Sequence, residues 1–151
     1  MAAVLLDANL LVLLIVGSAS RKMIGRHRRL RQYTEDDFDL LRRLISGHSP
    51  ILVSPNTLTE ASNLCRQISG REHERIAEVF RALLEEGTQE QFIGSQTATK
   101  HEAFPSLGLT DAVILQQMES RPLLITADLD LFLAAQRSGH AAINFNHVRP
   151  I

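Results

Sequence analysis

Four carboxylates in this sequence occupy positions that suit metal-dependent chemistry. Asp7 and Asp128 each follow a short apolar run that predicts a buried strand, and a helical pattern comes after each of them. Glu60 and Asp111 follow short loops and lie near the beginnings of predicted helices. Because the loops that leave the carboxyl ends of parallel strands converge on one edge of a sheet, we expect the four side chains to meet there.

Gathered carboxylates repel one another, and some would take up protons unless a cation neutralised them. Hard divalent ions such as Mg²⁺ and Mn²⁺ prefer oxygen ligands, and a pair of them can activate water and stabilise the leaving oxygen of a phosphate ester. The set therefore predicts phosphodiester hydrolysis. Taken singly, Asp7, Asp111 and Asp128 could instead stabilise helix N-termini by roughly 0.5–2 kcal/mol each. Glu60 could be a solvated surface residue.

The elements that must position these side chains alternate between short apolar runs and helical periodicity. Strands are predicted over residues 2–6, 51–53, 91–94, 123–126 and 141–145. Helices are predicted over 8–16, from Thr34 to Gly47, from Pro55 to Gly70, over 71–86 and 111–119, and after Asp128. Strands separated by helices predict an α/β protein, a three-layer α/β/α sandwich with a central, mainly parallel sheet.

Local signals refine the ends of these elements. Asp37, three residues after Thr34, predicts a variant of the capping box, and Gly87 predicts the end of a helix. Residues 105–108 are expected to form a loop, with Thr110 capping the next helix.

Composition is ordinary for a globular protein. The chain has 151 residues, 44% of them apolar and 22% charged, with a formal net charge of −1, so we expect one domain over 1–151. Cys65 is the sole cysteine, which excludes an intrachain disulfide and favours a cytoplasmic location. The apolar run 10–16 is too short to span a bilayer, so we expect no membrane association.

The four acidic segments, taken in order, resemble the PIN-domain ribonucleases. The matching segments are Asp7-Ala8-Asn9, Ser54-Pro55 with Glu60, Leu109-Thr110-Asp111-Ala112, and Thr126-Ala127-Asp128. Their order, spacing and local sequence agree with the family over nearly the whole chain.

This resemblance implies a PIN-like fold and a Mg²⁺- or Mn²⁺-dependent endonuclease of RNA, with the four carboxylates as its metal-binding acids. Asn9 and Thr126 would be polar supports beside them, and Asp130 is either a third support or a solvated residue. The length is similar to that of VapC-like toxins of bacterial type II toxin–antitoxin pairs. That narrower resemblance implies a homodimer silenced by a small antitoxin.

A basic stretch over 17–33 is expected to form an excursion between two helices. It holds six of the sixteen Lys and Arg residues of the chain within eleven positions. Arg26, Arg28 and Arg29 could contact RNA phosphates beside the acidic site. The alternative is a solvated, mobile loop.

Two other functions stay open at this point. The first is an Asp-phosphorylated phosphotransferase or response-regulator-like switch with Asp7 as the acceptor. Such phosphotransferases commonly carry a second Asp where this chain has Asn9, and both types place a Lys in the site, whereas the only lysines here are Lys22 and Lys100. The second is a catalytically silent module that binds RNA or an antitoxin, for which four repelling carboxylates have no use.

Overall fold

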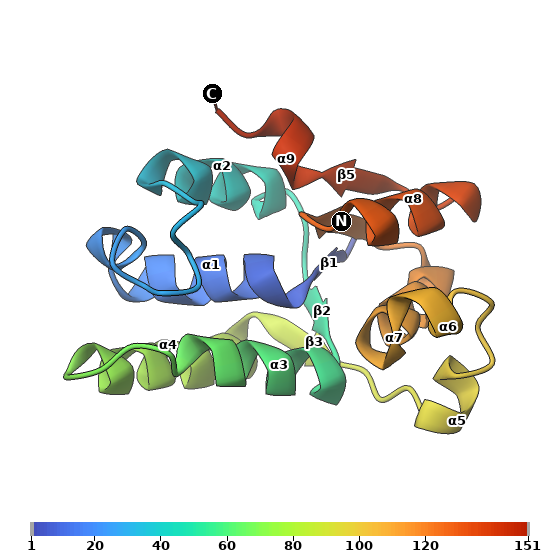
Figure 1. Cartoon of the computed structure of the whole chain (residues 1–151), viewed down its shortest axis with the longest axis horizontal. Helices are drawn as coiled ribbons and strands as arrows, with labels where there is room; N and C mark the ends of the chain where they lie inside the picture. Colours follow the sequence, from blue (N-terminus) through green and yellow to red (C-terminus); the bar gives the residue numbers. More distant parts are fainter. Residues whose placement is uncertain (1, 151) are drawn as a thin grey trace.

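A central sheet of parallel strands organises the protein, and the computed structural model describes residues 2–150 (Figure 1). Within that range the sheet has five strands in the order β3-β2-β1-β4-β5, all paired in parallel. The strands are β1 (Val4–Leu6), β2 (Ile51–Val53), β3 (Thr88–Glu90), β4 (Leu123–Thr126) and β5 (Ala142–Asn144). The predicted α/β/α sandwich with a mainly parallel sheet is confirmed.

Helices cover both faces of this sheet. They are α1 (Ala8–Ala19), α2 (Glu35–Ile45), α3 (Pro55–Cys65), α4 (Glu72–Glu86), α5 (Ser95–Ala98), α6 (Phe104–Leu107), α7 (Leu109–Gln117), α8 (Leu129–Arg137) and α9 (Phe145–Val148), with 3₁₀ turns η1 (Arg21–Met23) and η2 (Met118–Ser120). Helices α1 to α4 lie on one side of the strands, and α7 and α8 lie on the other (Figure 1).

Alternation of side chains along the strands explains why both faces are buried. In β1, Val4 and Leu6 pack into the core shared with α1 to α4, whereas Leu5 between them packs into the core shared with α7 and α8. Successive side chains of a strand point to opposite faces, so a strand covered on both sides must be apolar throughout. This is why the apolar runs correctly predicted β1, β2 and β4.

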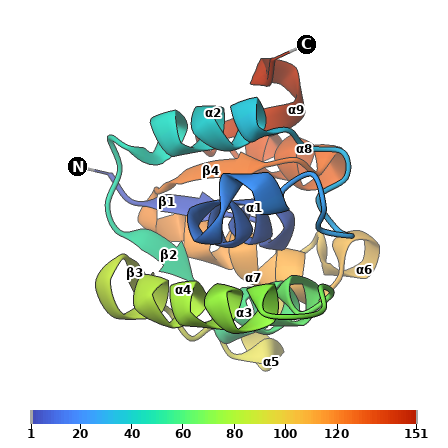
Figure 2. The same ribbon diagram turned by 90° about the vertical axis from the view of Figure 1, so that its left-hand side faces the viewer.

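Helix α1 lies at the centre of its layer, between α2 on one side and α3 with α4 on the other (Figure 2). Ten of its twelve residues are buried, as expected for a helix that is apolar on nearly all faces. The helix extends three residues beyond the predicted end, to Ala19, and the ring of Phe38 in α2 packs closely against Gly17 in this last turn. In residues 2–150 no helix combines the length and apolarity needed to cross a lipid bilayer.

The edge strand β3 is the main error in the predicted elements. A strand was expected over 91–94, but β3 precedes that segment and consists of Thr88, Gln89 and Glu90. Its side chains are half-buried or exposed, so no apolar run marks it. Ile93, in the segment predicted as a strand, packs instead into a small core beneath α5 and α7.

Two boundaries around α7 also differ from prediction. The helix begins at Leu109 rather than at residue 111, so Thr110 is not its N-cap. Gly108 occupies that position with φ of 88°, a left-handed conformation that glycine adopts without strain. The predicted loop over 105–108 contains most of the short helix α6, whose first turn accommodates proline.

The basic stretch packs onto the helical layer instead of projecting as a solvated loop. Its first residues belong to α1, and the remainder connects α1 to α2 through η1. Buried side chains of the connecting segment fix it to the protein, namely Met23, Ile24, His27, Leu30 and Tyr33, which are each at least 96% buried. The predicted capping box at the start of α2 is confirmed by reciprocal hydrogen bonds between Thr34 and Asp37.

The contact between Gly17 and Phe38 yields a test of the packing of α1 on α2. A Cβ atom at position 17 would lie 2.3 Å from the ring of Phe38. Gly17→Ala should therefore destabilise the protein by about 1–3 kcal/mol through overpacking, which outweighs the gain of about 1 kcal/mol in helix propensity. Urea denaturation would measure the change.

The matched control for this test is Gly25→Ala. A Cβ atom there meets nothing within 4 Å, so its free energy of unfolding should change by less than about 0.5 kcal/mol. A Gly17→Ala protein as stable as the wild type would contradict the described packing.

Candidate active site

The four carboxylates predicted from the sequence line one cleft at the carboxyl edge of the sheet. Asp7 follows β1, Asp128 follows β4, Glu60 lies in α3 and Asp111 lies in the first turn of α7. The cleft has a volume of about 340 Å³. None of its lining residues within 2–150 is Lys, Arg or His, so the cleft has no internal counter-charge. This convergence is what the parallel topology predicts.

Asp7 is the most rigidly held of the four. Its side chain is 6% exposed. Oδ1 accepts a hydrogen bond from the backbone N–H of Leu10 at 2.9 Å, and Oδ2 accepts from the hydroxyl of Thr126 and from the N–H of Ala127 at 2.9 Å. Burial raises its pKa, the three hydrogen bonds oppose that rise, and the charge of Asp128 adds to it.

Thr126 orients two of the acids through one buried hydroxyl group. Oγ1 donates to the carboxylate of Asp7 and accepts from the backbone N–H of Asp128 at 3.0 Å. Asp128 Oδ1 in turn accepts from the N–H of Leu131 at 3.1 Å, which caps α8. Thr126 therefore lies where a polar support was expected.

Helix capping accounts for only half of the cluster. Asp7 and Asp128 do cap α1 and α8, as the simpler interpretation of these residues requires. Glu60 does not cap α3, whose N-cap is Ser54, and Asp111 does not cap α7. The presence of these two carboxylates in the cleft needs another explanation.

Mutual repulsion among the acids shapes the electrostatics of the cleft. Burial, followed by the charges of Asp128, Asp7 and Glu60, raises the pKa of Asp111 to about 7. The Glu60 side chain is exposed overall, yet partial burial of its carboxyl group raises its pKa, with a smaller contribution from Asp7. The cleft thus holds more negative charge than it can easily accommodate at neutral pH.

The donor set fits a hard divalent cation in its chemistry. Carboxylate oxygens are the ligands that Mg²⁺ and Mn²⁺ prefer, and a cation would relieve the repulsion. As the side chains stand, no three His, Cys, Asp or Glu groups in residues 2–150 are gathered closely enough to hold a metal ion. Glu60 and Asp128 have exposed side chains, and a shared ion would require the carboxylates to come closer together than they lie here.

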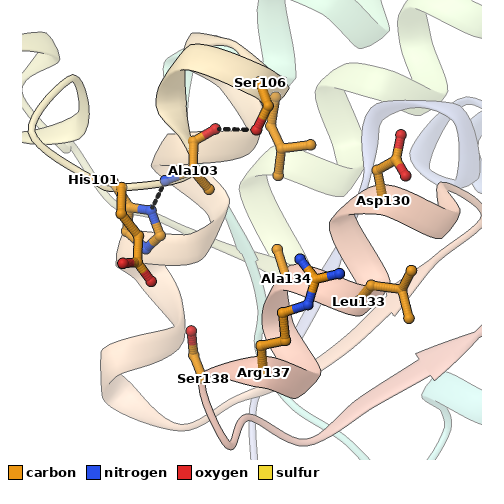
Figure 3. Close-up of a pocket in the computed structure, with 10 residues that line it drawn as sticks. His101, Ala103, Ser106, Asp130, Leu133, Ala134, Arg137 and Ser138 are labelled. Carbon is orange, nitrogen blue, oxygen red and sulfur yellow. Dashed lines mark hydrogen bonds between the residues drawn. The ribbon is translucent and has the colours of Figure 1, made fainter.

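The remaining predicted supports differ in their placement. Asn9 lines the acidic cleft from the first turn of α1. Asp130 does not line it. It faces a separate cavity of about 450 Å³, between α8 and the 101–107 segment, together with His101 and Arg137 (Figure 3). Asp130 therefore lies apart from the other acids.

The basic residues divide in a way that the sequence did not reveal. Arg28 and Arg29 line a second cleft beside the acidic one, and Arg31, which was not among the predicted contacts, lines it with them. Arg26, which was predicted to join them, instead forms an ion pair with Glu72 at 3.4 Å. Only the tertiary fold separates these side chains, because all four lie within six consecutive positions.

The raised pKa of Asp111 predicts a pH-dependent cost to stability. An unfolded Asp loses its proton near pH 4 and Asp111 in the native protein near pH 7, so this group makes stability fall as pH rises between these values. Asp111→Asn removes that penalty. In EDTA at pH 8 the variant should melt about 2–4 °C higher, corresponding to about 1 kcal/mol after solvent screening.

This advantage of Asp111→Asn should shrink as the pH approaches 4, where the wild-type carboxyl group is also neutral. Thermal denaturation at both pH values would measure it. Asp130→Asn, the same chemical change at an exposed position outside the acidic cleft, serves as the control and should show no such rise. A variant at position 111 that melts below the wild type at pH 8 would contradict this cost of a buried, repelled charge at Asp111.

The double role of the Thr126 hydroxyl predicts that its removal is costly. Thr126→Val keeps the shape but leaves the N–H of Asp128 without a partner, and it leaves Oδ2 of Asp7 with the N–H of Ala127 as its one remaining donor. We expect a loss of about 1–3 kcal/mol in the free energy of unfolding, measured by urea denaturation. Thr126→Ser retains the hydroxyl and should lose much less. Equal losses in the two variants would contradict this role, because they would mean that the hydroxyl group contributes no more to stability than the methyl group.

No protein-family model matches this chain, and neither a curated protein nor a solved structure is significantly similar to it.

Proposed function

We propose that this protein is a Mg²⁺- or Mn²⁺-dependent endoribonuclease that hydrolyses RNA phosphodiester bonds. The observation that carries the proposal is the meeting of Asp7, Glu60, Asp111 and Asp128 in one cleft that no basic residue lines. Two of these acids have no capping role, and burial together with the charges of the neighbouring acids raises the pKa of Asp111 to about 7. Proteins keep such unfavourable charge clusters mainly at functional sites.

The four carboxylates would hold the cation, and they differ in how firmly the protein fixes them. Asp7 offers a fixed anchor because its three hydrogen bonds define its orientation before substrate arrives. Glu60 and Asp128 have exposed side chains, so they are accessible to an ion or a substrate. When bound, Mg²⁺ or Mn²⁺ supplies activation of water and neutralisation of charge at the phosphate. The preorganised anchor limits the reorganisation that this chemistry requires.

The geometry disfavours Asp7 as a phosphoacceptor. A nucleophilic carboxylate needs an accessible oxygen, but Asp7 is 6% exposed and both of its oxygens accept hydrogen bonds. No Lys lines the cleft within the described chain, whereas phosphotransferases and response regulators use one. A silent binding module is disfavoured for a different reason, because four repelling acids weaken the fold without improving a binding surface.

The narrower assignment as a VapC-like toxin is also proposed, on the resemblance of the four acidic segments alone. It would make the protein a homodimer whose activity is blocked by a small antitoxin that inserts into the acidic cleft. Cytoplasmic location belongs to the same proposal.

The proposed activity is tested by incubating single-stranded and structured RNA with the protein and Mg²⁺ or Mn²⁺. We expect cleavage that EDTA abolishes and that Asp7→Asn or Asp111→Asn lowers by about 100-fold or more. The reason is that mutating even the residues that hydrogen-bond to metal ligands lowers metal affinity or activity by about 10–100-fold. Asp130→Asn, which lies outside the cleft, should retain activity. Rates would be measured from the loss of full-length RNA under multiple turnover.

Two outcomes would contradict this proposal. Cleavage that persists in EDTA excludes a divalent cation, and equal cleavage by the wild type and Asp111→Asn indicates a contaminating nuclease. Mn²⁺ should also raise the melting temperature of the wild type more than that of Asp111→Asn, which provides a readout that does not depend on activity.

A further inference from the structure

A second cleft, of about 480 Å³, adjoins the acidic one. We call it the arginine cleft, and it is lined by Asn9, Arg28, Arg29, Arg31, Gln32, Glu60 and Leu64. Asn9 and Glu60 line both clefts, so the two form neighbouring parts of one surface. The charge changes sign across this shared boundary, from carboxylates on one side to guanidinium groups on the other.

The geometry points to the arginine cleft as the binding site for the phosphodiester backbone of a single nucleic-acid strand whose scissile phosphate lies in the acidic cleft. This inference rests on the proposed nuclease function and extends it. It assigns the contacts beside the cut to Arg28, Arg29 and Arg31, and it excludes Arg26.

The charges of the arginine cleft are available to a ligand. Neighbouring arginines of the same stretch are already neutralised, since Arg21 pairs with Glu35 at 3.5 Å and with Asp39 at 2.6 Å. Arg26 pairs with Glu72. None of the ion pairs found within residues 2–150 involves the three arginines of the cleft, and all three are exposed.

The segment that carries these arginines is fixed from beneath. His27 is fully buried, its Nε2–H donates to the carbonyl of Cys65 at 3.1 Å, and its Nδ1 accepts from the N–H of Arg29 at 3.1 Å. Leu30 and Tyr33 are buried as well, so every third side chain points inward and those between point outward. A preorganised backbone lowers the entropy lost when the arginines engage a strand.

Electrostatics explains why such a site should stand beside the acids. A polyanionic strand is repelled by a cleft of four carboxylates, and contacts to adjacent phosphates offset that repulsion. The planar guanidinium group suits phosphate oxygens in geometry and charge. No aromatic side chain lines the arginine cleft in the described chain, so the contacts there are to the backbone and carry little sequence preference.

The experiment measures binding of a fluorescein-labelled 12-nucleotide single-stranded RNA in EDTA, where cleavage is blocked, at several salt concentrations. The test variant is Arg28→Ala/Arg29→Ala/Arg31→Ala. The matched control, Arg21→Ala/Lys22→Ala/Arg26→Ala, removes the same charge from the same stretch outside the arginine cleft. Each phosphate contact contributes about 0.7 to the slope of log affinity against log salt, so the test variant should lose about 2 and the control almost nothing.

Single-stranded DNA of the same sequence should show the same loss of slope in the test variant, because its phosphates are the same. A loss confined to RNA would indicate contacts to the 2′-hydroxyl and overturn the assignment to the backbone. Equal losses of slope in the test variant and the control would mean that only the net charge of the protein matters, and would also overturn the assignment to the arginine cleft. Circular dichroism checks folding, and if the triple variant is destabilised, the single change Arg31→Glu supplies the same comparison against Arg26→Glu.

The result is separable from that of the cleavage assay. Loss of slope in a protein that cleaves no RNA would reject the nuclease and leave the arginine cleft as a binding site. A wild type that cleaves RNA, with unchanged slope in the triple variant, would reject the arginine cleft and leave the nuclease.

Discussion

Asp7 directly follows β1, and its buried carboxylate accepts hydrogen bonds from Leu10, Thr126 and Ala127; the arrangement of the site depends on these contacts. The first starts α1, and the other two join the end of β1 to the end of β4. Two neighbouring strands and the helices that follow them are thereby held in register at the edge where the cleft opens. Thr126 also accepts a hydrogen bond from the N–H of Asp128, so the position of Asp128 is coupled to that of Asp7 through this hydroxyl group.

A buried carboxylate is tolerable only where hydrogen bonds replace the lost water, and Asp7 meets that condition. The repulsion it shares with Glu60, Asp111 and Asp128 still weakens the native state. Helix α1, which begins immediately behind Asp7 and buries ten of its twelve residues, supplies apolar burial at the same point in the chain. Helix α1, whose first turn holds the Asp7 carboxylate in place, is thus also a main source of the stability that offsets the repulsion.

Much of this arrangement follows from sequence because its causes are local or topological. Strands buried on both faces must be apolar, which revealed β1 and β4, and parallel strands must end at one edge, which gathered the acids. Other features depend on tertiary context. Arg26 and Arg31 are chemically alike, and only the fold distinguishes them. Arg26 lies beside an acidic partner, Glu72, whereas the side chain of Arg31 lines the arginine cleft. The start of α7 depends on the left-handed conformation of Gly108, which no periodicity in the chain predicts.

The polarity of strand β3 has two consequences: it makes the strand difficult to predict from the sequence, and it protects the edge of the sheet. It lies at the edge of the sheet, has three residues, and carries the polar sequence Thr88-Gln89-Glu90. A long apolar edge would offer unpaired backbone groups to the strands of other molecules, and proteins commonly prevent this with short, charged edge strands. The polarity that removed β3 from the pattern of apolar runs therefore makes this margin of the sheet a poor template for aggregation.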